Sequence, residues 1–180
     1  MKHQFKFLIL ILLPFILWSQ NSERNLSSEN WSFKKISDLN WLPAKVPGTV
    51  HTDLYNNKII TNPFFGNNEK DLQWIENETW EYQTSFKISK EELNNQNTIL
   101  QFEGLDTHAE VFLNDNKILI ANNMFRTWKV DVNDDLKVGK NNLKIVFKSA
   151  VEIGKTKAKK LPYTLPEKER IFSRKAQYHF

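Results

Sequence analysis

Alternation of apolar and polar residues is the strongest regular pattern in the chain. From Trp80 to Ile88, Trp, Tyr, Thr, Phe and Ile occupy every second position, and the residues between them are Glu, Gln, Ser and Lys. Such alternation over nine residues predicts a half-buried β-strand. Ser89 follows directly, with Glu92 three residues later, and this spacing predicts a capping box that starts one helical turn.

Five shorter segments also have the composition of strands. They are Thr98 to Glu103, Ala109 to Asn114, Lys117 to Ile120, Phe125 to Val132, and Leu143 to Phe147. Asn114-Asp115-Asn116-Lys117 predicts a hairpin turn, because Asn and Asp tolerate a positive φ. Val138-Gly139-Lys140-Asn141 predicts the turn before the last strand. Six short strands joined by turns predict an all-β fold, an antiparallel β-sandwich.

The segments on either side of these strands are less regular. Pro43, Pro47 and Gly48 interrupt residues 30–61, in which Thr49 to Tyr55 predicts one or two helical turns. Asn62 to Asn77 predicts a long surface loop, and a loop of that length is more often functional than idle. Residues 150–160 are rich in lysine, which is typical of a solvated helix face or a linker.

The N-terminus has the pattern of a secretory signal peptide. Lys2 and Lys6 precede an apolar run from Phe7 to Trp18, and polar residues follow it. The run is shorter than the about 20 residues of a membrane-spanning helix, although an N-terminal membrane anchor is the alternative. We therefore predict a signal peptide over 1–20, the sandwich over 21–149, and a basic C-terminal segment over 150–180. The protein would be exported to the periplasm or the cell exterior.

Charge and composition exclude several classes of function. Without Lys2 and Lys6 the formal net charge falls from +4 to +2, which is too weak for a nucleic-acid footprint. The chain has no cysteine, and its four histidines are far apart, so neither a thiolate site nor a zinc site is expected. No phosphate-binding glycine loop or nucleophile elbow occurs. We expect no cofactor and no metal, and the acidic residues do not single out a catalytic carboxylate pair.

The segment from Asn67 to Asn77 favours sugar binding. Sugars are recognised by aromatic faces together with amides and carboxylates, and this segment contains all three. The candidate substrate-binding residues are Asn68, Glu69, Trp74 and Glu76. The alternative is that Trp74 fills the core while the polar groups face water.

Seven groups of residues, in order along the chain, carry a resemblance to a known family. They are Val46 to Leu54; Asn62-Pro63-Phe64; Asn68-Glu69 with Leu72 to Ile75; Trp80-Glu81-Tyr82; Phe102 to Thr107 with Ala109-Glu110-Val111; Asn123-Met124-Phe125; and Arg174 to Tyr178. Together they resemble the N-terminal domain of β-mannosidases, in the glycoside hydrolase family that also holds β-galactosidases and β-glucuronidases. Gly104-Leu105-Asp106-Thr107 is common to the wider family, whereas Leu72 to Ile75 and Arg174 to Gln177 are closer to β-mannosidases.

This resemblance implies a jelly-roll-like β-sandwich, the sugar-binding domain, followed in the family by an immunoglobulin-like sandwich and a (β/α)8 barrel. The barrel carries both catalytic glutamates of a retaining mechanism, so no catalytic residue is expected here. The chain would be the N-terminal part of a secreted β-mannosidase that removes terminal non-reducing β-D-mannose without a cofactor. Its partners would be β-mannoside glycans and the remaining domains. The sequence ends before the family's Gly-Trp-Asp-Trp-Gly segment, so we expect a fragment that is inactive alone.

The resemblance also suggests roles for single residues. The segment from Asn68 to Asn77 would reach the pocket of the barrel, with Trp74 as its apolar wall. Arg174 and Lys175 would either orient the missing segment or pair with Glu103 or Glu110. We interpret Asp106, Thr107 and His51 as structural and expect Phe125 to pack in the core. The alternatives are a stand-alone carbohydrate-binding module and a fragment of a β-galactosidase or β-glucuronidase.

Overall fold

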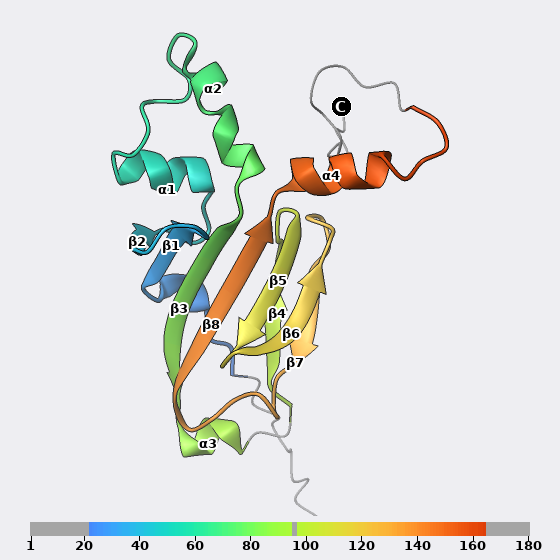
Figure 1. The fold of residues 1–180 in the computed structure, drawn as a ribbon. Coiled ribbons are helices and arrows are strands. Elements are labelled where there is room, and N and C mark those ends of the chain that lie inside the picture. The colour runs from blue at the N-terminus through green and yellow to red at the C-terminus, as the bar shows by residue number, and fades with distance from the viewer. Residues whose placement is uncertain (1–21, 95–96, 165–180) are drawn as a thin grey trace, which may run out of the picture.

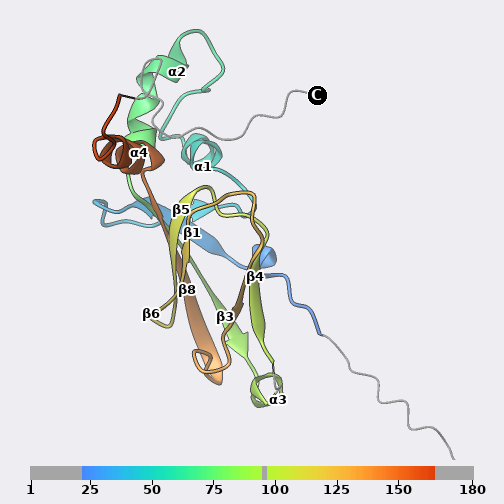
Figure 2. The same ribbon diagram turned by 90° about the vertical axis from the view of Figure 1, so that its right-hand side faces the viewer.

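The protein contains two antiparallel β-sheets of unequal width (Figures 1 and 2). A computed structural model describes residues 22–94 and 97–164, so the predicted signal peptide and Arg174-Lys175 lie outside the described residues. The larger sheet has six strands in the order β2-β1-β3-β8-β5-β6, and the smaller one pairs β4 with β7. The strands are β1 (Trp31–Lys35), β2 (Leu42–Ala44), β3 (Trp80–Ile88), β4 (Ile99–Phe102), β5 (His108–Leu113), β6 (Asn116–Ala121), β7 (Trp128–Asp131) and β8 (Gly139–Lys148). This architecture confirms the predicted all-β antiparallel sandwich.

The long central pair β3–β8 organises the core. Its register runs from Trp80 opposite Phe147 to Ile88 opposite Gly139. Alternation then places Trp80, Tyr82 and Phe86 on the buried face, as the sequence predicts. Phe33 of β1 is fully buried beside them, with its ring centroid 6.0 Å from that of Trp80 and 5.5 Å from that of Tyr82. Each such side chain contributes about 1.5–3 kcal/mol through burial.

Short helices lie between the strands, and most of them gather at the two ends of the larger sheet. They are η1 (Leu26–Ser28), α1 (Val50–Asn56), α2 (Asn68–Asp71), η2 (Gln73–Asn77), α3 (Lys90–Leu93) and α4 (Ala150–Ala158). Figure 1 shows α1, α2 and α4 at one end, which we call the helical end, and α3 at the other. The capping box of Ser89 and Glu92 is present at α3, and α1 confirms the predicted helical turns. None of the helices within 22–94 and 97–164 has the length and apolar character needed to cross a membrane.

Several local predictions were wrong. The predicted loop over 62–77 contains α2 and η2, and β1 and β2 were not predicted as strands. Phe125 is 62% exposed instead of buried, because an Asx turn, in which its N–H donates to Asn123 Oδ1, delays β7 until Trp128.

The turn predicted at 138–141 lies earlier in the chain. The β8 strand already begins at Gly139. The buried Asn141 side chain accepts a hydrogen bond from Lys137 N–H and donates one to the Lys137 carbonyl, so the turn closes before β8. The Asn114–Asp115 hairpin turn is confirmed, because both residues have a positive φ.

Candidate functional site

A groove of about 1540 Å³ runs between the two sheets, and we call it the inter-sheet groove. Its wall on the larger sheet is apolar and includes Trp80, Tyr82, Leu143, Ile145 and Phe147. The whole of β4 forms part of the opposite wall. Polar residues from several loops and helices form its rim; they are His51, Glu76, Asp106, Thr107, Asn122 and Asn123. The groove therefore combines an apolar interior with a hydrogen-bonding rim.

The structure places one of the four predicted binding residues, Glu76, at this rim. Its backbone carbonyl accepts a 2.6 Å hydrogen bond from Ser149 Oγ, which joins η2 to the start of α4. Asn68, Glu69 and Trp74 are not among the described residues that line the groove. Asn68 Nδ2 instead donates to the Asn62 carbonyl at 2.7 Å, which closes the loop before α2, and Glu69 is exposed on α2.

Trp74 lies on η2 with part of its ring in the core and part in solvent. Its ring centroid is 6.0 Å from that of Trp80, and Lys35 Nζ lies 5.8 Å from the Trp74 ring. The side chain is nevertheless 37% exposed. Trp74 therefore packs against the core on one side and exposes apolar surface to solvent on the other.

His51 and Glu76 both line the rim, a proximity that sequence reasoning missed. Partial burial lowers the pKa of His51, and the nearby charge of Glu76 opposes this shift. The imidazole is thus neutral at pH 7 and can both donate and accept a hydrogen bond. The two residues come from α1 and η2, and nothing in their sequence spacing indicates that the fold brings them together.

A buried hydrogen-bond network holds the segment that presents His51. Asp53 of α1 is 1% exposed; its Oδ1 accepts from Lys45 N–H and its Oδ2 from Tyr82 O–H, both at 2.9 Å. Between Lys45 and α1 the Val46–Pro47 peptide bond is cis, and Thr49 caps α1 by accepting from Thr52 N–H at 3.2 Å. This network fixes the position of α1 relative to β3, and with it the position of His51.

Asp106 and Thr107 form another part of the rim. The peptide bond between them is cis, and the Thr107 hydroxyl donates to Asp106 Oδ1. Carboxylates, amides and a neutral imidazole therefore converge on the rim, a set of donors and acceptors that suits a ligand rich in hydroxyl groups. Among residues 22–94 and 97–164, no three His, Cys, Asp or Glu side chains are grouped so that they could hold a metal ion.

Comparisons with known proteins agree with the motifs in the sequence. Residues 31–180 match the family described as glycosyl hydrolase 2 galactose-binding domain-like. The chain is 33% identical to a probable beta-mannosidase of Caenorhabditis elegans, with 84% of this chain and 18% of that protein covered. It is 37% identical to beta-mannosidase B of Aspergillus terreus, with 83% and 19% covered. The chain thus spans less than a fifth of the length of these relatives.

Solved structures show the same fold. The beta-D-mannosidase of Dictyoglomus thermophilum superposes with a TM-score of 0.73 and 42% identity, over 74% of this chain and 16% of that one. The exo-chitosanase of Amycolatopsis orientalis has a TM-score of 0.60 at 18% identity over 68% of this chain and 16% of that one, a likeness of fold alone. The family match over residues 31–180 confirms the resemblance read from the motifs: the chain belongs to the glycosyl hydrolase 2 galactose-binding domain-like family.

Proposed function

We propose that this chain is the N-terminal, non-catalytic sandwich domain of an exported retaining β-mannosidase, which removes terminal non-reducing β-D-mannose from glycans. The observation that carries the proposal is the difference in identity among proteins that share this fold. Identity reaches 42% with a solved beta-D-mannosidase and stays at 18% with an exo-chitosanase. The signal-peptide pattern of residues 1–20 supports export.

In this proposal the helical end faces the catalytic domain, and the rim contributes hydrogen-bonding groups to the sugar pocket. His51, Glu76 and Asn123 are exposed there on separate loops and helices that the sheet holds in place. The catalytic glutamates belong to the remaining domains of the polypeptide, so the 180-residue chain is inactive alone. No cofactor is required.

Substrate preference tests this proposal. The full-length gene product and the 180-residue chain would each be assayed with 4-nitrophenyl β-mannoside, β-galactoside and β-glucuronide. We expect only the full-length protein to act, with the mannoside preferred and the β-anomer formed first in a proton NMR time course. Turnover by the pure 180-residue chain, or a preference for another sugar, would contradict the proposal. Binding of mannotriose by the chain alone in calorimetry would favour a stand-alone module.

The role of Trp74 is tested by Trp74→Ala in the full-length enzyme. If the exposed part of the ring lines the pocket, kcat/KM for the mannoside falls about tenfold or more. Trp41→Ala is the matched control, because Trp41 lies at the hollow lined by Glu81 and Phe112, outside the inter-sheet groove. An unchanged kcat/KM in a folded Trp74→Ala variant would remove this residue from the site.

Export is tested on the protein recovered from its own cells. We expect the N-terminus found by mass spectrometry to lie within a few residues of position 21. Recovery of the protein in the cytoplasm with residues 1–20 intact would contradict export.

A further inference from the structure

The larger sheet has a second face, which is turned away from the inter-sheet groove. Figure 2 shows β4 on one side of β8, and we call the opposite side of the larger sheet the outer face. Side chains alternate between the two faces of a strand, so the residues between the buried positions of β3 and β8 lie on the outer face. They form three cross-strand pairs: Gln83 with Lys144, Ser85 with Asn142, and Lys87 with Lys140. The outer face is therefore polar along these two strands, where the inner face is apolar.

A hollow of about 370 Å³ lies on this face, and we call it the outer hollow. Its volume falls within the roughly 300–1,000 Å³ of a typical ligand pocket. The side chains of Gln83, Ser85 and Asn142 line it. None of these three side chains has a hydrogen-bond partner in the part of the chain that the structure describes. Amide and hydroxyl groups can both donate and accept hydrogen bonds, so the outer hollow offers free hydrogen-bonding groups to a ligand.

Ion pairs neutralise the outer face near the helical end. Lys34 Nζ lies 3.4 Å from Glu81 Oε2, and the same ammonium group covers the Trp41 ring at 5.2 Å. Lys148 Nζ lies 2.7 Å from Glu110 Oε1. Both pairs lie where β3 begins and β8 ends. The charged groups at this level of the sheet are thus already engaged within the protein.

Toward α3 the lysines of the outer face are unpaired. Among residues 22–94 and 97–164, Lys87, Lys140 and Lys144 form no ion pair. Lys140 and Lys144 line the outer hollow, and Lys144 Nζ lies over the Phe112 ring at 5.1 Å, a contact that attracts the ammonium group to this position. Asp115 also lines the hollow and offsets one of these charges. A net positive charge therefore remains beside the free amides.

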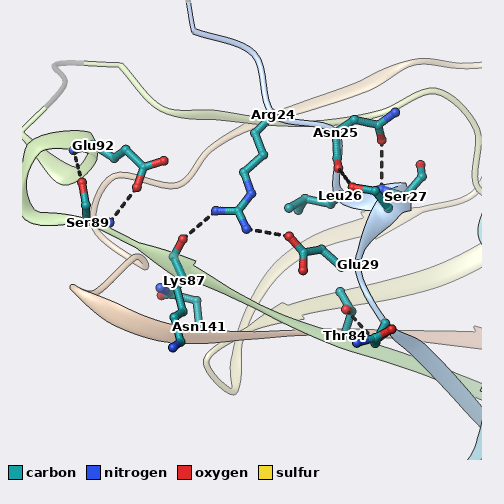
Figure 3. Close-up of polar contacts among 12 residues, drawn as sticks. Arg24, Asn25, Leu26, Ser27, Glu29, Thr84, Lys87, Ser89, Glu92 and Asn141 are labelled. Atoms are coloured by element: carbon teal, nitrogen blue, oxygen red, sulfur yellow. Dashed lines mark hydrogen bonds and ion pairs between the residues drawn. The ribbon is translucent and has the colours of Figure 1, made fainter.

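Two of the unpaired lysines are held directly opposite each other. Lys87 and Lys140 are register partners, and like charges in that position destabilise a sheet. Both strands are fixed at this point. Arg24 Nη1 donates to the Lys87 carbonyl at 2.6 Å (Figure 3), and Asn141 Nδ2 donates to the Gly139 carbonyl at 3.1 Å. The repulsion is thus built into the fold, and an anion bound between the two ammonium groups would relieve it.

We propose that the outer hollow binds an acidic polysaccharide, one that carries carboxylate or sulfate groups. Lys87, Lys140 and Lys144 pair with the anionic groups, and the amides of Gln83 and Asn142 bond to the sugar hydroxyls. The free amides beside the lysines favour a sugar over other polyanions, because hydroxyl groups use both the donors and the acceptors of an amide. The site lies on the face of the sheet opposite the inter-sheet groove, so the proposal stands whether or not the enzyme prefers mannosides.

Binding by the full-length gene product tests the proposal with two matched pairs of polymers. The pairs are polygalacturonate with its methyl ester, and dextran sulfate with dextran. In affinity electrophoresis at low salt we expect binding to at least one charged polymer and to neither neutral one, with an affinity that falls as salt is added. The charged polymer that binds more tightly identifies the anionic group. Binding to neither charged polymer, equal binding within a pair, or tighter binding to single-stranded DNA or to phosphatidylserine vesicles would overturn the proposal.

A double variant locates the binding on the outer hollow. Lys140→Gln with Lys144→Gln removes two charges from its lining. The matched control is Lys159→Gln with Lys160→Gln, which removes the same charge from exposed positions just after α4. We expect the affinity for the charged polymer to fall about fivefold or more in the first variant and to stay within about twofold in the control. Equal losses would show a general attraction to a basic protein and would contradict the proposal.

Chemical acetylation of lysines gives a readout that needs no variant. Labelling of the full-length protein with and without the charged polymer would be compared by mass spectrometry of peptides. We expect the bound polymer to slow acetylation of Lys87, Lys140 and Lys144 several-fold and to leave Lys159 and Lys160 unchanged. Unchanged labelling of the first three lysines in the presence of bound polymer would place the ligand elsewhere and overturn the assignment.

Discussion

The buried pair of Asp53 and Tyr82 gives the sharpest test of how the helical end is held to the sheet. Asp53→Ala removes the acceptor for two donors, Lys45 N–H and Tyr82 O–H, each at 2.9 Å. An unsatisfied buried donor costs about 1–3 kcal/mol, so the two donors together should cost about 2–6 kcal/mol in the free energy of unfolding. Tyr82→Phe removes one hydrogen bond to a carboxylate and should cost about 1.5–3 kcal/mol.

Urea unfolding of the purified chain, followed by tryptophan fluorescence, would measure both variants and the double variant. Residues in one network are not independent, so the double variant should lose less than the sum of the single variants, by about 0.5–3 kcal/mol. Losses that add to within about 0.3–0.5 kcal/mol would refute the proposed coupling between α1 and β3.

The same pair makes the stability depend on pH. Burial, reinforced by the charge of Asp53 and by the hydrogen bond to it, raises the pKa of Tyr82 above its ordinary value. In the unfolded chain tyrosine loses its proton above about pH 10, whereas folded Tyr82 keeps it. Protonated Tyr82 therefore contributes fully to the free energy of unfolding below about pH 10. Above that pH its contribution falls by about 1.4 kcal/mol per pH unit. The stability difference between wild type and Tyr82→Phe should shrink from pH 9 to pH 11, and a constant difference would refute the assignment.

Three further predictions concern local structure. Ser89→Ala removes the cap of α3 and should cost about 1 kcal/mol in urea unfolding, whereas Ser85→Ala on the exposed face of β3 should cost almost nothing. Gly48→Ala would place its Cβ 2.2 Å from the Lys45 carbonyl oxygen, so we expect overpacking to cost about 1–3 kcal/mol and to lower Tm in calorimetry. The hydrogen bond from Lys148 is the largest of the effects that lower the pKa of Glu110. Ionised Glu110 therefore stabilises the fold at neutral pH, and this stabilisation is lost as the pH falls through the lowered pKa. Glu110→Gln should cost no more than about 1 kcal/mol at pH 7 because the pair is exposed, and a loss that persists in 1 M salt would contradict this electrostatic origin.

The central strands were predictable because their signals are local. The alternation from Trp80 to Ile88 matches β3 at both ends, and the Ser89–Glu92 spacing matches the cap of α3. The Asn114–Asp115 turn was predictable for the same reason, since the side chains that tolerate a positive φ are those that occupy it.

The edge strands and the rim were not predictable in the same way. The short β2 strand contains Pro43, which can occupy an edge strand and cannot donate to a ladder. β1 contains two adjacent lysines, which hide the alternation of a strand. Lys34 forms an ion pair with Glu81 at 3.4 Å and lies 5.2 Å from the Trp41 ring, and both contacts exist only once the sheet has formed. His51 and Glu76 likewise lie near each other only because the tertiary structure brings α1 and η2 together.

The connections at the helical end are very short, and this has a mechanical consequence. η2 ends at Asn77 and β3 begins at Trp80, while β8 ends at Lys148 and α4 begins at Ala150. The Ser149 hydroxyl ties these two connections together through the Glu76 carbonyl. Neither η2 nor α4 therefore has enough slack to swing independently of the strand next to it, so these two helices move with the sheet. In the proposed enzyme, an opening that admits a bulky sugar would therefore come from segments other than η2 and α4.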